Sequence, residues 1–140
     1  MRKSISKNNY LFIGVDLIKN KTTLDKAYND KKGYTAKFSL NLINIINRTQ
    51  KTNLNINDFY YHGFYNTKLK CIQGFLVSKV NQTFEIGHKR FFLKKNERVL
   101  VEISNKFTIE SFKRLASNTG WTTKRVWLDN QKYYSLFLLK

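Results

Sequence analysis

The sequence predicts an α/β fold in which a β-rich antiparallel segment is inserted between the strands and helices of the main sheet. Three observations predict it: residues 10–17 form a near-continuous apolar run, the middle third carries short β-rich segments, and a helical pattern near the end precedes two strand-like runs. Hydrophobic residues make up 41% of the 140 residues. This is enough for a packed core and excludes an intrinsically disordered polybasic chain.

The first third of the chain predicts one strand and two helices. Residues 10–17 suit a buried strand of a mostly parallel sheet, with Asp16 near its carboxyl end. Residues 22–28 begin like a capped helix, and Gly33 then breaks the chain. A longer helix is predicted over residues 36–50, because four apolar residues recur at helical spacing. We expect this stripe to pack against a sheet; it consists of Phe38, Leu42, Ile45 and Ile46.

The rest of the chain predicts strands, one helix and a closing hairpin. Five short antiparallel strands separated by polar turns are predicted over residues 59–65, 69–78, 82–86, 90–93 and 99–105. Thr108 is a favourable N-cap, and Phe107 and Phe112 are placed for a hydrophobic staple. Gly120 suits the position just after the helix. The closing hairpin is predicted from residues 123–128 and 133–139.

The strongest compositional signal is a formal charge of +17, from 26 Lys and Arg against 9 Asp and Glu. Clustered basic residues neutralise phosphates, so this balance suggests a nucleic-acid partner. Compositional drift is the competing interpretation, because lysine outnumbers arginine 20 to 6 and no run of bases reaches five. The 16 Asn and 11 Ile, with 3 Ala and no Pro, are typical of an AT-rich genome. The charge alone does not distinguish a nucleic-acid partner from compositional drift.

Several classes of protein find no support in the sequence. No apolar run is long enough to span a bilayer, and the amino terminus has no secretory signal. A single cysteine, Cys71, excludes an internal disulfide, so we expect a cytoplasmic protein. His62, His88 and Cys71 are isolated, and no metal site is predicted. The six glycines never form a GxG pattern, so no phosphate-binding loop is visible.

Glu102 and Ser104 form the most informative local feature. Alternate residues of a strand share a face, so Val101 and Ile103 should point one way and Glu102 and Ser104 the other, with Cβ atoms roughly 7 Å apart. A carboxylate and a hydroxyl at that spacing can hold the two ends of a small cationic or imidazole-like group. The same spacing also fits the ordinary solvent face of a half-buried strand.

Seven short stretches carry a resemblance to a known family. They are residues 14–20, 27–30, 33–41, 64–66, 82–83, 102–107 and 127–129. In this order they resemble the carboxyl-terminal half of the histidine-specific, S-adenosylmethionine-dependent methyltransferases. These enzymes make the trimethylated histidine betaine that begins ergothioneine synthesis.

The resemblance implies the carboxyl-terminal part of a class I methyltransferase sheet, with a substrate-recognition lobe inserted after the fifth strand. Residues 1–35 and 106–140 are then expected to be the remnant of the methyltransferase core, and residues 36–105 the lobe. The resemblance also implies substrate-binding roles: Tyr28 holds part of the amino acid, while Glu102 and Ser104 bind its imidazole.

The chain departs from the family pattern at informative positions. Asn29 stands where the family usually has aspartate, and Ser39 where it has asparagine. Gly74 replaces a bulky residue, commonly methionine, that lines the family's substrate pocket. We expect this change to leave space for several methylene groups in the pocket. The substrate could then be one other than histidine.

The cofactor-binding segments of the family precede its fifth strand, and only nine residues precede residue 10 here. We therefore expect no catalytic or cofactor-binding residue in this chain. S-adenosylmethionine is expected only if an amino-terminal half complements it, because methyl transfer needs both reactants held in line.

The leading expectation is a truncated or split methyltransferase that is inactive alone and recognises a small amino-acid substrate. Strand 10–17 would then form an exposed apolar edge, which predicts a separately encoded cofactor-binding half or self-association through this strand. Two alternatives remain. One is a non-catalytic basic module that binds nucleic acid weakly, and the other is a small amino-acid sensor that uses Tyr28, Glu102 and Ser104.

Overall fold

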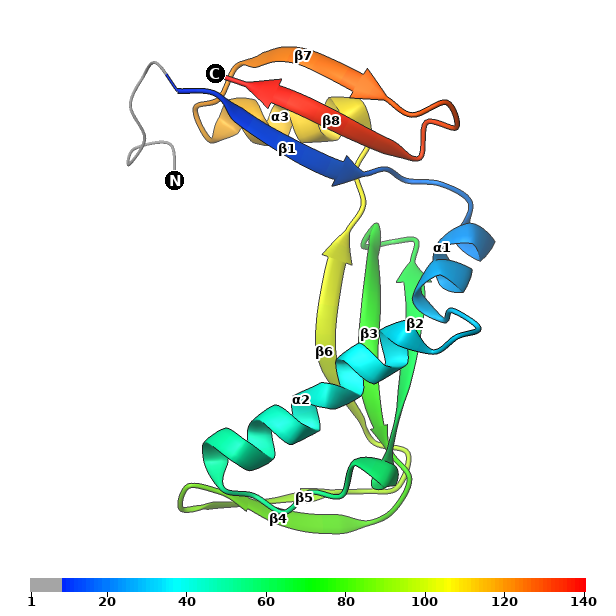
Figure 1. The fold of residues 1–140 in the computed structure, drawn as a ribbon, viewed down its shortest axis with the longest axis vertical. Coiled ribbons are helices and arrows are strands. Elements are labelled where there is room, and N and C mark those ends of the chain that lie inside the picture. Colours follow the sequence, from blue (N-terminus) through cyan, green and yellow to red (C-terminus); the bar gives the residue numbers. More distant parts are fainter. Residues whose placement is uncertain (1–8) are drawn as a thin grey trace. The chain divides into compact units, whose positions relative to one another are not determined.

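The computed structural model describes residues 9–140 and confirms a mixed α/β chain with antiparallel sheets (Figure 1). The chain divides into two compact units. The first comprises the described residues up to Asn20 together with Asn105–Lys140, and the second comprises Lys21–Ser104. Residues 21–35, expected from the sequence to belong with both termini, therefore lie in the second unit. The assignment of the units to a methyltransferase core and a substrate-recognition lobe stays a prediction.

The first unit is a three-stranded sheet with one helix. Its elements are β1 (Leu11–Asp16), α3 (Ile109–Asn118), β7 (Thr123–Leu128) and β8 (Tyr134–Leu139). The sheet order is β1-β8-β7, and both pairs are antiparallel. The prediction that residues 10–17 belong to a mostly parallel sheet is therefore wrong for the strands described here. The hairpin that ends the chain supplies the neighbour of β1 and leaves β1 as the outer strand.

Helix α3 covers one face of this sheet, as its sequence pattern predicts. The buried core joins Phe112 and Ala116 of the helix to Val15 and Phe137 of the strands. The Thr108 side chain accepts a hydrogen bond from the Ser111 N–H at 3.0 Å, and Ser111 reciprocates, which confirms the N-cap as a capping box. Two further predictions are also confirmed, because the Phe107 and Phe112 rings meet edge to face at 5.4 Å and Gly120 has a φ of 83°.

The second unit contains two helices, a short 3-10 helix and five strands. They are α1 (Lys21–Tyr28), α2 (Tyr34–Gln50), η2 (Ile56–Asp58), β2 (Phe59–Asn66), β3 (Cys71–Ser78), β4 (Gln82–Ile86), β5 (Lys89–Leu93) and β6 (Arg98–Asn105). Strands β2, β3 and β6 form one sheet in that order, and β4 and β5 form a separate hairpin. A hydrophobic core joins Ile43 of α2 to Phe59, Leu76 and Leu93.

Helix α2 packs through part of the predicted stripe, because Leu42 and Ile46 pack against the core around Ile43. Ser39 and Ile43 are buried, whereas Phe38 is 79% exposed and Ile45 is 40% exposed. Apolar side chains cover more than one face of this helix, so the periodicity alone does not identify the buried one. None of the helices in residues 9–140 has the length and apolar character needed to cross a bilayer.

Candidate functional site

The site begins with helix α1, whose polar side chains complete the free edge of strand β2. The Asp25 carboxylate accepts a hydrogen bond from the Tyr65 N–H at 2.7 Å. The Asn29 amide donates to the Gly63 carbonyl at 2.7 Å and accepts from the Gly63 N–H at 3.3 Å. Backbone groups at a strand edge need partners of this kind. Asp25 and Asn29 therefore fix α1 against β2, and with it the position of Tyr28.

Three consecutive residues that begin with the last residue of α1 have three separate roles. The Tyr28 hydroxyl donates to the Ser104 Oγ at 2.9 Å, which joins α1 to β6. Asn29 bonds to β2, and the Asp30 carboxylate accepts from the Tyr34 and Thr35 N–H groups at 2.8 and 2.9 Å. Asp30 thus caps the start of α2. Hydrogen bonds from the Thr35 and Tyr34 backbone hold the pKa of Asp30 below its ordinary value.

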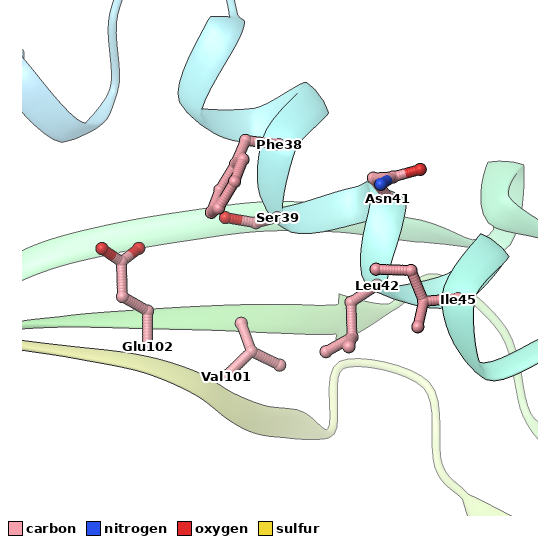
Figure 2. Close-up of a pocket in the computed structure, with 7 residues that line it drawn as sticks. All are labelled: Phe38, Ser39, Asn41, Leu42, Ile45, Val101 and Glu102. Carbon is pink, nitrogen blue, oxygen red and sulfur yellow. The ribbon is translucent and has the colours of Figure 1, made fainter. Parts of the chain in front are cut away.

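Glu102 lies at one end of a pocket between α2 and β6 (Figure 2). The pocket has a volume of about 240 Å³ and is lined by Phe38, Ser39, Asn41, Leu42, Ile45, Val101 and Glu102. Its wall on α2 contains three residues of the expected apolar stripe, Phe38, Leu42 and Ile45. Val101 and Glu102, consecutive residues of β6, both line this pocket.

Gly74 lies beside Glu102, but the space above it is not open. A Cβ atom at Gly74 would lie 2.9 Å from both Cε2 and the hydroxyl oxygen of Tyr61, and 3.1 Å from the Glu102 Cβ. The expectation that Gly74 opens room of several methylene groups is therefore wrong. The aromatic ring of Tyr61, from the neighbouring strand, takes that space.

Tyr61 is the residue of this site that the sequence analysis missed. Its hydroxyl oxygen is buried and has no hydrogen-bond partner among the described residues. Burial, with the negative charge of Glu102 and the nearby Tyr28 adding to it, raises the pKa of Tyr61 to about 12. The phenol is therefore neutral at physiological pH. Tyr61 lies near both Glu102 and Tyr28, so it connects the two parts of the predicted site.

The structure thus places all four predicted site residues in the second unit. Tyr28 and Ser104 are directly hydrogen-bonded, and Gly74 and Glu102 are neighbours under the Tyr61 ring. The pocket of Figure 2 contains Glu102 but is not lined by the other three. Among residues 9–140, no group of three or more His, Cys, Asp or Glu side chains is placed to hold a metal ion.

The carboxyl end of strand β1 does not fit S-adenosylmethionine, because an ion-paired cluster lies there. Asp16 pairs with Lys19 at 2.5 Å and with Lys106 at 3.0 Å, and the Lys106 side chain is 1% exposed. Two ammonium groups on one carboxylate leave a positive charge, which does not suit a sulfonium cation.

The fold and the site together define an α/β protein with a cluster of tyrosine, serine and carboxylate groups in its second unit. Comparison with known proteins makes this specific: the family described as "Histidine-specific methyltransferase, SAM-dependent" matches residues 1–140. The chain therefore belongs to the histidine-specific, SAM-dependent methyltransferase family, which confirms the resemblance seen in the sequence.

Two curated relatives share the same name. The chain is 27% identical over 130 residues to the histidine N-alpha-methyltransferase of Mycobacterium tuberculosis (strain CDC 1551 / Oshkosh), and the match covers 91% of this chain. It is 25% identical over 130 residues to the protein of that name from Mycolicibacterium smegmatis (strain ATCC 700084 / mc(2)155). In each case the chain spans 40% of the relative's length.

Proposed function

We propose that this chain is the substrate-recognition part of a histidine-specific, SAM-dependent N-methyltransferase and that it does not transfer a methyl group by itself. The observation that carries the proposal is the hydrogen bond between Tyr28 and Ser104, on the same unit as Glu102 and Tyr61. These side chains come from α1, β2 and β6, so folding of the unit brings them together.

The chemistry of these groups suits the imidazole of histidine. An imidazole ring has one N–H donor and one acceptor nitrogen when neutral. The Glu102 carboxylate can accept from the N–H, and the Ser104 hydroxyl can donate to the other nitrogen. Tyr28 orients Ser104 through the 2.9 Å hydrogen bond. Because all three side chains are polar and partly buried, their hydrogen bonds to a ligand favour this ring over an apolar one of similar size.

The methyl donor is proposed to bind to a segment outside these 140 residues. The family uses S-adenosylmethionine, and the chain spans 40% of the length of its two relatives. We propose that a cofactor-binding half supplies this segment and pairs with the chain along β1. The complete assembly would make the trimethylated histidine betaine of ergothioneine synthesis. We place it in the cytoplasm, where the buried free thiol of Cys71 stays reduced.

Calorimetric titration of the 140-residue chain with L-histidine tests the recognition role. We expect heat of binding for the wild-type chain and a loss of about tenfold or more in affinity for Glu102→Gln, which removes the negative charge at the imidazole. Glu110→Gln, an exposed residue on α3, is the matched control and should bind as the wild type does. Equal affinities for all three chains would exclude Glu102 from the site.

A methylation assay with labelled S-adenosylmethionine tests the division of labour. We expect no product from the chain alone, and product when the chain is co-expressed with the part of a relative that it does not cover. Methylation of histidine by the 140-residue chain by itself would contradict the proposal. Histidine binding with no activity in any combination would favour the amino-acid sensor instead.

A second candidate function, binding of single-stranded nucleic acid, rests on one face of the β1-β8-β7 sheet. Phe12 is 59% exposed and stacks with Trp127 at a ring distance of 5.9 Å. Arg125 lies over the Trp127 ring at 4.9 Å, and Lys140 lies over Tyr10 at 5.5 Å. Exposed aromatic rings beside cations are what bases and phosphates need for stacking and charge pairing.

Fluorescence anisotropy with a labelled single-stranded oligonucleotide separates this candidate from the first. Binding through this face should weaken steeply with added salt and should fall further in Trp127→Ala. A flat salt response, or equal binding by Trp127→Ala, would exclude this mode.

A further inference from the structure

We propose that Tyr61 determines the size of the ligand that the site accepts beside Glu102, because its ring occupies the space that a side chain at position 74 would otherwise fill. The inference rests on the proposed function and adds a specificity-determining residue to it.

Two glycines face each other beneath the Tyr61 ring. Gly63 of β2 pairs with Gly74 of β3 in the antiparallel register. A Cβ atom at Gly63 would lie 2.5 Å from the Tyr61 hydroxyl oxygen, and one at Gly74 would lie 2.9 Å from it. Neither distance is compatible with a side chain while the ring stays in place. The pair of glycines therefore forms a notch across two strands, and the ring lies in it.

The notch borders the group that is proposed to bind the ligand. A Cβ atom at Gly74 would approach the Glu102 Cβ to 3.1 Å, so any atom that fills this space limits the room beside the Glu102 side chain. In this chain the limiting atoms belong to a residue thirteen positions earlier in the sequence, on the adjacent strand. Tyr61 and Gly74 thus form a complementary pair: the residue on β2 has a large side chain, and the residue on β3 has none.

The buried hydroxyl gives a second reason to connect Tyr61 with a ligand. Buried hydroxyl groups in folded proteins nearly always have a hydrogen-bond partner, and that of Tyr61 has none among the described residues. Burial and, after it, the nearby carboxylate of Glu102 raise the pKa of Tyr61, which keeps the phenol neutral and able to donate. The hydroxyl can thus donate a hydrogen bond to the Glu102 carboxylate or to an acceptor atom of a bound ligand.

The test compares the binding of L-histidine with that of L-histidine carrying a benzyl group on its ring, by calorimetry on the full 140-residue chain. Wild type should favour histidine, and Tyr61→Val should lower this preference by about tenfold, since pocket volume on the scale of a few methylene groups is worth that much or more. Tyr61→Phe, which keeps the ring, should retain the preference. Gly74→Met combined with Tyr61→Val should restore it by refilling the notch.

Tyr60→Val is the matched control. Tyr60 is the adjacent residue of the same strand, so its side chain points to the opposite face, and it is 43% exposed. It should leave the preference unchanged. An unchanged preference in Tyr61→Val, with histidine still bound, would overturn the proposal while the proposed function stands. Tyr61→Leu takes the place of Tyr61→Val should the latter fail to fold.

Thermal unfolding provides an arm that needs no ligand. Gly74→Ala should lower the melting temperature of the wild-type chain, because the added Cβ meets the Tyr61 ring, and should be tolerated in Tyr61→Val. An equal loss in both backgrounds would show that Tyr61 does not fill the notch, and would overturn the proposal. If wild type binds no histidine, the proposed function fails, and this arm alone decides whether Tyr61 occupies the space.

Discussion

At the scale of single residues, Asn29 shows how a departure from the family pattern acquires a structural role. The family usually has aspartate at this position, but the Asn29 amide both donates to and accepts from the backbone of Gly63. A carboxylate has no hydrogen to donate and would face the Gly63 carbonyl oxygen at the 2.7 Å distance of the present hydrogen bond. The amide is therefore the better partner for this strand edge.

We predict that Asn29→Asp destabilises this chain at neutral pH by about 1–3 kcal/mol, the range for leaving a buried acceptor without its donor. The free energy of unfolding in urea measures the effect. Asn44→Asp, on an exposed part of α2, is the control and should change stability by less than about 0.5 kcal/mol. The same small change for Asn29→Asp would show that the Gly63 carbonyl does not depend on this donor.

Tyr61 and Gly74 mark the limit of sequence reasoning at this scale. Tyr28, Glu102 and Ser104 could be selected because they match family motifs, and the structure joins Tyr28 to Ser104. Tyr61 matches no motif, and its importance depends on a cross-strand register. The observed register pairs Gly63 with Gly74 and places Tyr61 on the same face, and the predicted strands 59–65 and 69–78 did not fix this register. Two facing glycines are a sign that a large side chain lies across them.

At the scale of elements, local signals predicted the secondary structure well because the physical causes are local. The capping box at Thr108 and the positive φ of Gly120 mark the two ends of the ten-residue helix α3. The buried face of α2 could not be predicted in the same way, because the helix has apolar residues on two faces and the contacts with β2 and β3 select one. The cluster of Asp16, Lys19 and Lys106 was also missed, since it depends on the bridge between Leu17 and Phe107.

The start of helix α2 gives a prediction for pH. The pKa of Asp30 is lower in the folded state than its ordinary value of 3.8. The ionised carboxylate therefore stabilises the fold at a pH above 3.8, and this stability is lost as the pH falls toward the folded pKa. The free energy of unfolding should therefore fall with acidification below about pH 4. Asp30→Asn keeps a capping oxygen but cannot titrate, so its stability should fall less over the same range.

Urea unfolding at intervals between about pH 2.5 and 6 measures both curves. Asp129 provides an internal comparison, because hydrogen bonds from the Tyr134 and Tyr133 backbone also lower its pKa. Asp129→Asn should remove a separate part of the pH dependence of the free energy of unfolding. Superimposable curves for wild type and Asp30→Asn would mean that the carboxylate at the start of α2 contributes nothing through its charge.

At the scale of the whole molecule, the outer strand β1 is more informative about partners than the net charge of +17. The charge is spread over a chain whose lysines mostly lie outside the proposed site, and it gives no preference for a particular ligand. The outer strand is more specific. The Leu17 N–H donates to the Tyr133 carbonyl next to β8, so the backbone of the alternate residues, Phe12 among them, faces the other edge. At that edge the Phe107 N–H donates to the Asp16 carbonyl, and the Phe107 carbonyl accepts from the Ile18 N–H. These bonds cover only the carboxyl end of the β1 edge.

We predict that β1 drives association, and that Phe12→Pro prevents it. Proline removes the Phe12 N–H at the open edge and leaves the hydrogen bonds to β8 in place, because those come from the neighbouring residues. Sedimentation of the wild-type chain at rising concentration should give masses above the 16.7 kDa of one chain, whereas Phe12→Pro should stay at that mass. Phe12→Leu keeps both the N–H and an apolar side chain, so it should associate like the wild type. This control separates the loss of the edge hydrogen bond from the loss of the exposed ring.

A wild-type chain that sediments as a monomer throughout would exclude self-association through β1 and leave a separately encoded half as the partner for this edge. The Phe12→Pro chain should then also fail in the co-expression assay, since the two halves would have to pair along the same strand.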